Sequence, residues 1–214
     1  MRFEIKDNAI YFTREGERGK LSACGENSIR FQASPTGRLI DQDWTLMPYP
    51  VEAKAWQEGT YAVLEVGEMS AKIYDNGRIE YLKGNKKILS EKCELTFESG
   101  IRNYLNKASG LWIARVTFEA NAGEDFDGLG HEATGCFDLK GCTIDLRHVN
   151  AKCTIPYVYS SLGYGFLWNM PSTGSCELAN NRTRWVSDST KQMDYVVIGG
   201  NPKEVTNTLT DLTV

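Results

Sequence analysis

The chain has few histidines, no excess of basic residues and no long apolar run. Its 214 residues hold 24 Lys and Arg against 28 Asp and Glu, which gives a formal charge of −4. Nucleic acids select a basic patch, and a membrane-spanning helix needs roughly 18 apolar residues in a row. Neither is therefore a predicted partner. Residues 1–7 alternate charged and apolar side chains, which predicts no secretory signal and a cytoplasmic location.

The six cysteines include no Cys-x-x-Cys pair. They are Cys24, Cys93, Cys136, Cys142, Cys153 and Cys176. A chain of this length can bury a core without disulfide bonds, and cysteine is among the most often buried residues. We therefore predict free, mostly buried thiols. The distances in sequence from His131 and His148 to these cysteines match none of the usual zinc-ligand spacings, so neither a metal nor a cofactor is predicted.

Familiar catalytic signatures are also lacking. The glycines at 128 and 130 are not followed by the third glycine, or by the Lys and Ser or Thr, of a phosphate-binding loop, so a backbone turn that needs glycine is the better interpretation. No Gly-x-Ser-x-Gly motif supports a hydrolase serine. An acid–base pair could lie within one cluster of carboxylates, although acids in a loop are usually solvated. The cluster comprises Glu124, Asp125, Asp127, Glu132 and Asp138.

The dominant pattern in the chain is an alternation of apolar and polar residues, with every second side chain apolar. Residues 29, 31 and 33 are apolar and alternate with polar residues at 28, 30 and 32, as in a strand with one buried face. Asn76-Gly77 separates two further alternating segments, and this dipeptide tolerates the positive φ angles of a tight primed hairpin turn. Many short strands joined by Gly and Asn turns predict an all-β fold, an antiparallel β-sandwich of two sheets.

Two segments have helical features. Residues 99–108 could form a short helical turn. At the C-terminus, Asn201 can cap a helix, Pro202 suits its first position and Glu204 lies three residues after the cap. An apolar stripe follows at residues 205, 209 and 212. This apolar stripe needs a surface to pack against, and a domain outside this chain could provide that surface. Residues 121–156 are the most irregular part, and long loops in compact domains are often functional.

Eight segments occur in an order that is typical of one enzyme family. They are CGENSIR at 24–30, GLGHE at 128–132, FDLKG at 137–141, IDL at 144–146, IPYVYSS at 155–161, GYGFLWN at 163–169, DYVVIGG at 194–200 and TDLT at 210–213. Over nearly the whole chain, they resemble the N-terminal domain of glycoside hydrolase family 31, the family of α-glucosidases and α-xylosidases.

This resemblance implies a galactose mutarotase-like supersandwich over residues 1–214, with a short C-terminal helix. The family's two catalytic Asp residues lie on a (β/α)₈ barrel, which alone takes about 250 residues and is absent from this chain. The resemblance therefore implies no catalytic residue here and no activity of the chain alone. Its implied partners are the barrel of the same polypeptide and an α-linked sugar, while the choice of sugar and a homo-oligomeric parent stay open.

In family members, a loop of this domain reaches over the barrel mouth and often carries an Arg-Asp or similar pair just before an Ile-Pro segment. The matching residues here are 149–152, Val-Asn-Ala-Lys. The resemblance thus implies that Asn150 and Lys152 bind substrate. An amide both donates and accepts hydrogen bonds, so recognition of a sugar hydroxyl survives the change to Asn150, whereas the charge of an Asp does not. Tyr164 and Trp168 are predicted to lie in the core rather than against sugar.

Two other functions are compatible with the sequence. A stand-alone carbohydrate-binding module would need an exposed aromatic platform, which the sequence does not locate. An aldose epimerase would need a general base and a general acid near the sugar, and only His131 and His148 are available as histidines.

Overall fold

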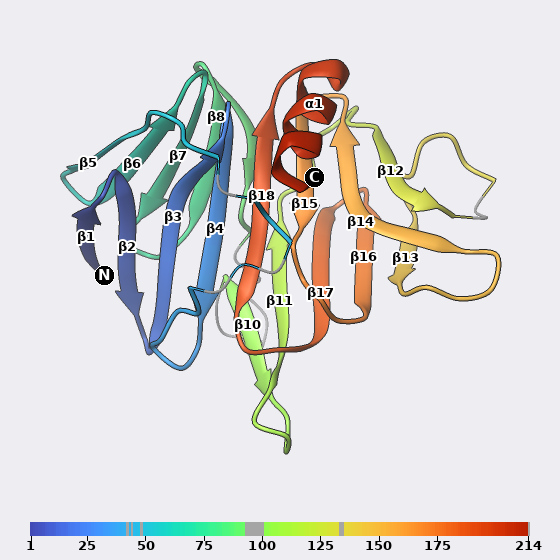
Figure 1. The fold of residues 1–214 in the computed structure, drawn as a ribbon, viewed down its shortest axis with the longest axis horizontal. Coiled ribbons are helices and arrows are strands. Elements are labelled where there is room, and N and C mark those ends of the chain that lie inside the picture. The colour runs from blue at the N-terminus through green and yellow to red at the C-terminus, as the bar shows by residue number, and fades with distance from the viewer. Residues whose placement is uncertain (42, 44, 48, 93–100, 133–134, 214) are drawn as a thin grey trace.

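The computed structural model describes residues 1–41, 43, 45–47, 49–92, 101–132 and 135–213. These residues form eighteen strands and one helix, and the strands build three antiparallel sheets in two layers (Figure 1). The first layer is one eight-stranded sheet. In spatial order its strands are β1 (Arg2–Lys6), β2 (Ala9–Arg14), β3 (Glu17–Gly25), β4 (Ser28–Ser34), β18 (Met193–Gly199), β15 (Tyr164–Trp168), β14 (Cys153–Ser160) and β12 (Phe126–His131).

Two five-stranded sheets make up the second layer. One follows chain order, with β5 (Lys54–Glu58), β6 (Tyr61–Val66), β7 (Met69–Tyr74), β8 (Ile79–Lys83) and β9 (Lys86–Ser90). The other has the spatial order β10 (Arg102–Asn106), β11 (Trp112–Phe118), β17 (Arg182–Thr190), β16 (Gly174–Ala179) and β13 (Thr143–Leu146). The predicted β-sandwich is confirmed, but the prediction of two sheets is wrong, because its second layer is divided.

The two parts of the second layer meet just after β9. Glu91 forms an isolated antiparallel bridge with Phe118 at the end of β11. The N–H of Lys92 donates to the Thr117 carbonyl at 2.8 Å, and the N–H of Glu119 donates to the Ser90 carbonyl at 2.8 Å. This short pairing joins the sheets only at one end, so their remaining strands can follow different parts of the twisted eight-stranded sheet.

Aromatic side chains fill the space between the layers. The ring of Phe166 on β15 stacks on Trp185 of β17 and on Tyr195 of β18, with centroid distances of 4.9 and 5.1 Å. Trp168 and Tyr164 are each only 1% exposed, which confirms that both belong to the core. Stacked and edge-on aromatic pairs are favourable beyond their burial alone, and these rings connect the eight-stranded sheet to the sheet that contains β17.

Strand β4 is buried on both faces, not on one face as its alternating pattern predicts. All seven of its residues are buried, including Arg30 and Gln32. The Nε of Arg30 donates to Asp194 on β18 at 2.9 Å, and its Nη2 donates to Asp43 at 2.5 Å. Asp43 lies in the connection between β4 and β5. Polar side chains are thus buried here because distant residues supply partners for them.

The helix α1 (Pro202–Thr213) begins with the predicted cap. Asn201 Oδ1 accepts the N–H groups of Lys203 and Glu204 at 3.0 and 3.1 Å, and Glu204 Oε2 accepts the N–H of Asn201 at 2.8 Å. This reciprocal arrangement is a capping box. It satisfies backbone donors that a helix start otherwise leaves without partners.

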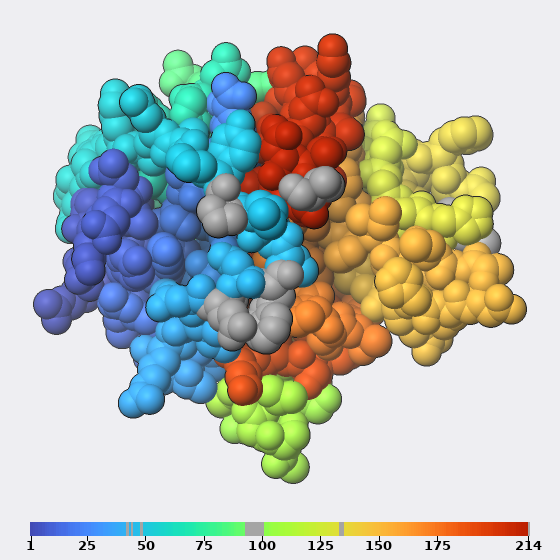
Figure 2. Space-filling model, viewed as in Figure 1, coloured from blue at the N-terminus to red at the C-terminus, as the bar shows by residue number. Residues whose placement is uncertain are grey.

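The apolar stripe of α1 packs within this chain and needs no further domain to cover it. The helix lies on the outer face of the eight-stranded sheet against β18, β3 and β15 (Figure 1). Beside it runs the connection between β4 and β5 (Figure 2). The Met47 N–H of this connection donates to the Leu212 carbonyl at 2.8 Å. Together they cover a second, smaller apolar cluster of Leu46, Leu167, Val196, Ile198, Val205 and Leu212.

Three local predictions need correction. Residues 102–106 form the strand β10, not a helical turn, because they pair with β11; residues 99 and 100 lie outside the described part. The hairpin at Asn76-Gly77 is confirmed, but only Gly77 has a positive φ (88°), so the turn is not of the primed type. Gly128 and Gly130 lie in the strand β12, not in a turn, at a β-bulge whose extra residues belong to the paired strand β14. No helix in the described residues is long and apolar enough to cross a membrane.

Glycine is required at both positions of this bulge. Gly128 and Gly130 have φ angles of 131° and 79°. A Cβ at Gly128 would lie 2.5 Å from the Tyr157 carbonyl oxygen, and one at Gly130 would lie 2.3 Å from the Cys153 carbonyl oxygen. The bulge shifts the register between β12 and β14, and it lies beside the segment that carries the predicted site.

Candidate functional site

Asn150 occupies an exposed β-turn at one end of the molecule. Val149 and Lys152 form an antiparallel bridge across the turn, and the N–H of Lys152 donates to the Val149 carbonyl at 3.1 Å. Ala151 takes a positive φ of 63°, which is uncommon for a residue with a Cβ. Within the described residues, the side-chain amide of Asn150 makes no hydrogen bond, so it is available to a ligand.

Lys152 lies in the same turn but in a different environment. Its side chain is 18% exposed, and its Nζ lies 2.9 Å from Glu132 Oε2. The same Nζ donates to the Asp145 carbonyl at 2.6 Å. The chain itself therefore binds this ammonium group from two sides. This arrangement fixes the turn against the end of β12, and a ligand would meet an ammonium group that already has two partners.

Glu132 and Thr154 hold the base of the turn. The Thr154 hydroxyl lies 2.9 Å from Glu132 Oε1 and 3.0 Å from the Arg147 carbonyl, so these acceptors share its one proton. The N–H of Thr154 lies 3.4 Å from His148 Nδ1, which accepts it. His131 pairs with Cys153 across β12 and β14, which places Glu132 opposite Lys152. Sequence analysis missed this pair, since only the strand pairing brings the two residues together.

Two adjoining cavities lie at the base of the turn. The smaller, of about 330 Å³, is lined among others by Arg147, His148 and Thr154. The larger, of about 470 Å³, extends toward Arg30 and Asp194. Both volumes suit a small ligand. The two cavities share part of their lining, namely Pro156, Trp168, Met170 and Pro171.

One end of the larger cavity is polar. Burial raises the pKa of Asp194, and the hydrogen bonds from Arg30 oppose this rise. Arg30 contacts both Asp194 and Asp43 through its Nη2. Each of the three charged groups therefore has a partner within the chain, and one cation between two carboxylates leaves this end with a net negative charge.

The clustered carboxylates of residues 124–138 have separate structural roles. Glu124, only 2% exposed, accepts hydrogen bonds from Ser160 Oγ and Tyr164 Oη, both at 2.7 Å. Asp138 Oδ1 accepts the backbone N–H groups of residues 126 and 140 at 2.9 and 2.8 Å. Glu132 holds Lys152. The remaining two carboxylates, Asp125 and Asp127, are exposed. Three of the five are thus engaged in holding strands and loops together.

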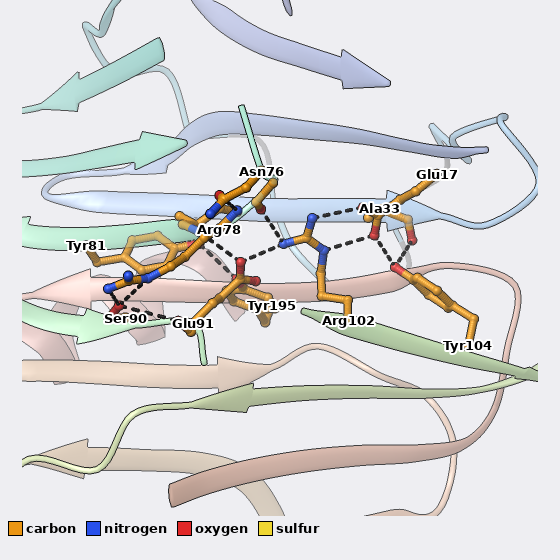
Figure 3. Close-up of polar contacts among 12 residues, drawn as sticks. Glu17, Ala33, Asn76, Arg78, Tyr81, Ser90, Glu91, Arg102, Tyr104 and Tyr195 are labelled. Carbon is orange, nitrogen blue, oxygen red and sulfur yellow. Dashed lines mark hydrogen bonds and ion pairs between the residues drawn. The ribbon is translucent and has the colours of Figure 1, made fainter. Parts of the chain in front are cut away.

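A second polar cluster, which sequence analysis missed, is buried between the sheets (Figure 3). Arg102 on β10 donates from Nε and Nη2 to the two oxygens of Glu17 at 2.9 and 2.8 Å. Its Nη1 donates to Glu91 at 2.6 Å and to the Gly77 carbonyl at 3.1 Å. Tyr104 Oη donates to Glu17 at 2.9 Å. This Arg102 network joins β3, β10 and the residue that follows β9.

The two glutamates of the Arg102 network differ in acidity. Burial tends to raise the pKa of Glu17, but the charge of Arg102 and the hydrogen bonds from Arg102 and Tyr104 outweigh it and lower that pKa. Burial of Glu91 is more complete and raises its pKa in spite of Arg102. Carboxyl groups with separated pKa values are typical of acid–base catalysis. Here, however, Arg102 binds both carboxylates and its own side chain is 1% exposed, so the network holds the fold together.

The predicted free thiols are confirmed for the five described cysteines, whereas their burial is not. Cys176 is buried, Cys24 and Cys142 are half-buried, and Cys136 and Cys153 are exposed. Cys93 lies outside the described residues. The two exposed thiols belong to the same end of the molecule as Asn150, where short strands and turns leave little apolar cover.

Comparison with known proteins relates the chain to one enzyme family. No family model matches it. An uncharacterized family 31 glucosidase of Pseudescherichia vulneris is 29% identical over an alignment of 214 residues. The alignment covers 91% of this chain and 40% of the relative. Alpha-xylosidase A of Aspergillus niger is 35% identical over 89 residues, or 42% of this chain and 12% of the relative. An alpha-xylosidase of Saccharolobus solfataricus is 36% identical over 105 residues, or 45% of this chain and 14% of the relative.

The solved structures give the same result. A family 31 alpha-xylosidase from a soil metagenome, complexed with xylose, superimposes with a TM-score of 0.93 and 29% identity; the match covers 100% of this chain and 34% of that one. A dextranase of Flavobacterium johnsoniae shares the fold, with a TM-score of 0.80 at 16% identity over 100% of this chain and 28% of the dextranase. The chain therefore spans well under half the length of these relatives, and it corresponds to their N-terminal portion.

Proposed function

We propose that this chain, an N-terminal β-sandwich domain of the glycoside hydrolase family 31 type, serves as the non-catalytic N-terminal domain of a retaining α-glycosidase. One observation carries the proposal: the whole chain superimposes on about a third of an alpha-xylosidase with a TM-score of 0.93. The remaining two thirds of that enzyme have no counterpart in residues 1–214. A retaining glycosidase needs two carboxyl groups about 5–5.5 Å apart on a rigid scaffold, and we assign them to a barrel in the rest of the polypeptide.

In the full enzyme, the turn at residues 149–152 contributes to sugar binding. The amide of Asn150 is exposed and can both donate to and accept from sugar hydroxyls. Lys152 is held by Glu132 and by the Asp145 carbonyl, so its main effect is to position the turn. This division of roles refines the expectation that both residues contact substrate.

We further propose that the full enzyme acts on α-xylosides. Support comes from the relatives of Aspergillus niger and Saccharolobus solfataricus, which are alpha-xylosidases, and from the metagenomic enzyme, whose structure contains xylose. A xyloside lacks the hydroxymethyl group of a glucoside, so an enzyme that excludes this group by shape distinguishes the two sugars.

The test compares the chain alone with the full polypeptide that includes its downstream coding sequence. We expect the full enzyme to hydrolyse nitrophenyl α-xyloside faster than nitrophenyl α-glucoside, and residues 1–214 alone to hydrolyse neither. Turnover by the pure 214-residue chain would contradict the non-catalytic assignment. A preference for the glucoside would overturn only the choice of sugar.

A further inference from the structure

The larger of the two adjoining cavities has mainly apolar walls. Its volume is about 470 Å³, and its apolar lining includes Leu46, Leu111, Leu167 and Met170. Ile40 also lines it, and its side chain is 38% exposed. Contiguous apolar surface that is open to water marks a contact site for another apolar surface. The cavity therefore suits an occupant with apolar side chains.

The polar groups of this cavity do not favour a polar small molecule. Arg30 already has Asp43 and Asp194 as partners. The side chain of Gln192 accepts the N–H of Ile40 at 2.8 Å and donates to the carbonyl of the same residue at 3.3 Å. Groups that bind one another in this way leave few donors and acceptors to select a sugar. A segment of polypeptide with apolar side chains fits the cavity better.

The end of α1 lies at the same cavity. Thr213, the last residue that the structure describes, is part of the lining. Its Oγ1 donates to the Leu209 carbonyl at 2.8 Å, and the Leu212 carbonyl accepts the N–H of Met47 at 2.8 Å. These bonds hold the end of the helix in place. A polypeptide that continues past residue 214 therefore leaves from the rim of the cavity.

The relatives indicate how much polypeptide there is to place. The match covers 40% of the Pseudescherichia vulneris glucosidase and 34% of the metagenomic alpha-xylosidase, and it corresponds to their N-terminal portion. In the proposed full enzyme, most of the polypeptide thus follows residue 214. The apolar stripe of α1 is already covered within this chain. The cavity beside the end of the helix is the apolar surface that the following residues reach first.

We propose that the segment directly after Val214 enters this cavity with apolar side chains and so fixes the following domain against the sandwich. The proposal rests on the proposed function, in which the catalytic barrel follows this chain. A cavity of about 470 Å³ is roughly 10 Å across, and an extended chain advances about 3.3–3.6 Å per residue, so roughly three residues span it. The contact then belongs to about the first five residues after Val214.

This contact also bears on the turn at 149–152. The two cavities share a wall that includes Trp168 and Met170, and the smaller cavity reaches Thr154 at the base of the turn. Trp168 is 1% exposed, so close packing fixes its position in the wall. A segment held on one side of this wall has a defined position relative to the turn on the other side. The cavity contact thus places the barrel relative to Asn150.

Photochemical cross-linking in the full polypeptide tests the proposal directly. Ile40→benzoylphenylalanine places a photoreactive group at the rim of the cavity. Trypsin cleaves after Lys203, so the peptide that carries the segment begins at Glu204 and runs past Val214. After irradiation and digestion, we expect this peptide to be joined to the peptide of the probe. Fragmentation should locate the attachment within about the first five residues after Val214.

A second probe position gives the matched control. Leu105→benzoylphenylalanine lies at a side chain that is 57% exposed and is not part of the cavity lining, so it should not join this peptide. The proposal would be overturned if the probe at residue 40 joined only more distant downstream segments, or joined two copies into a covalent dimer. Hydrolysis of nitrophenyl α-xyloside tests the proposed function separately. An active full enzyme without the link contradicts only the cavity contact, whereas the link in an inactive polypeptide contradicts only the proposed function.

Lysine acetylation tests the same contact without any substitution. Lys191 is exposed in the turn between β17 and β18 and lines the cavity. Lys54 is exposed on β5, far from the cavity (Figure 1). We expect the two lysines to react with an acetyl succinimidyl ester at similar rates in residues 1–214 alone. In the full polypeptide, Lys191 should react several-fold more slowly and Lys54 at its former rate. An unchanged rate at Lys191 would show that the cavity stays open.

Discussion

At the scale of single residues, Arg102 uses all three of its guanidinium nitrogens in hydrogen bonds within the fold. Its guanidinium forms a bidentate pair with Glu17 and a further ion pair with Glu91, all nearly out of contact with water. The charges lose their hydration on burial, and only the complete set of partners compensates for this loss. Removing one partner therefore leaves buried charges without compensation.

We expect Arg102→Met to lower the free energy of unfolding by about 3–5 kcal/mol, because it leaves the carboxylates of Glu17 and Glu91 facing each other without a cation. Urea denaturation of the 214-residue chain measures this change. Arg147→Met is the matched control, since Arg147 is exposed and lies 3.7 Å from Asp145; exposed substitutions usually stay within about 0.5 kcal/mol. Equal stability of the two variants would contradict the role of the network.

The Arg102 network also gives stability a dependence on pH. Because the pKa of Glu17 is lower in the folded state than its usual value of 4.5, its stabilising contribution is present above the unfolded pKa and is lost as the pH falls through the folded pKa. Glu91 acts in the opposite sense, since its raised pKa makes the folded state bind a proton more readily on acidification. We expect Glu17→Gln to be less stable than wild type at neutral pH, and this difference in stability to narrow as the pH falls below about 4.5. Thermal unfolding from pH 7 to pH 3 checks it; a constant difference would contradict the assignment.

Asn150 should matter for catalysis rather than for folding. A hydrogen bond contributes about 0.5–1.5 kcal/mol, so Asn150→Ala should lower kcat/KM of the full enzyme by roughly 2- to 13-fold. The isolated chain should change by no more than about 0.5 kcal/mol, because the side chain is exposed and makes no hydrogen bond within the described residues. A collapse of the domain's melting temperature with unchanged kinetics would instead make Asn150 a structural turn residue.

At the scale of elements, the sequence predicts well where the determinants are local. The start of α1 depends on Asn201 and Glu204, which are three residues apart, and the prediction is confirmed. The prediction for residues 102–106 is wrong because their state depends on β11 and on the partners of Arg102, which come from β3 and from Glu91. The second buried face of β4 likewise depends on Asp43 and Asp194. The pair of Glu132 and Lys152 follows from strand register, which no short motif encodes.

The cap of α1 leads to a prediction at this scale. Asn201→Ala removes the acceptor of two backbone N–H groups and should cost about 1 kcal/mol, within a range of roughly 0.5–2 kcal/mol. Asn207→Ala is the matched control, because Asn207 is exposed within the same helix, where alanine is the better helix former and should leave stability equal or slightly higher. Urea midpoints of the two variants provide the comparison. Equal losses would show that the capping box contributes nothing.

At the scale of the whole molecule, the helix completes the outer face of the eight-stranded sheet. Val196 and Ile198 on β18 point away from the main core, and Val205 and Leu212 of α1 cover them; all four are 0% exposed. The described residues thus form two apolar clusters on opposite faces of one sheet. Since both apolar clusters are covered within the described residues, we infer that residues 1–214 fold as an independent domain.

This inference can be tested by removing the helix. We expect residues 1–214 to unfold in one cooperative transition, and a chain shortened to residues 1–200 to have a lower melting temperature and to bind an apolar dye, because β18 and β15 would expose the smaller cluster to water. Leu212→Ala in the full 214 residues should give part of the same effect, about 2–5 kcal/mol, as expected for a buried leucine. Leu105→Ala, at a side chain that is 57% exposed, serves as the control. An unchanged melting temperature of the shortened chain would mean that α1 only rests on the sheet, and that its apolar stripe belongs to an interface with another domain.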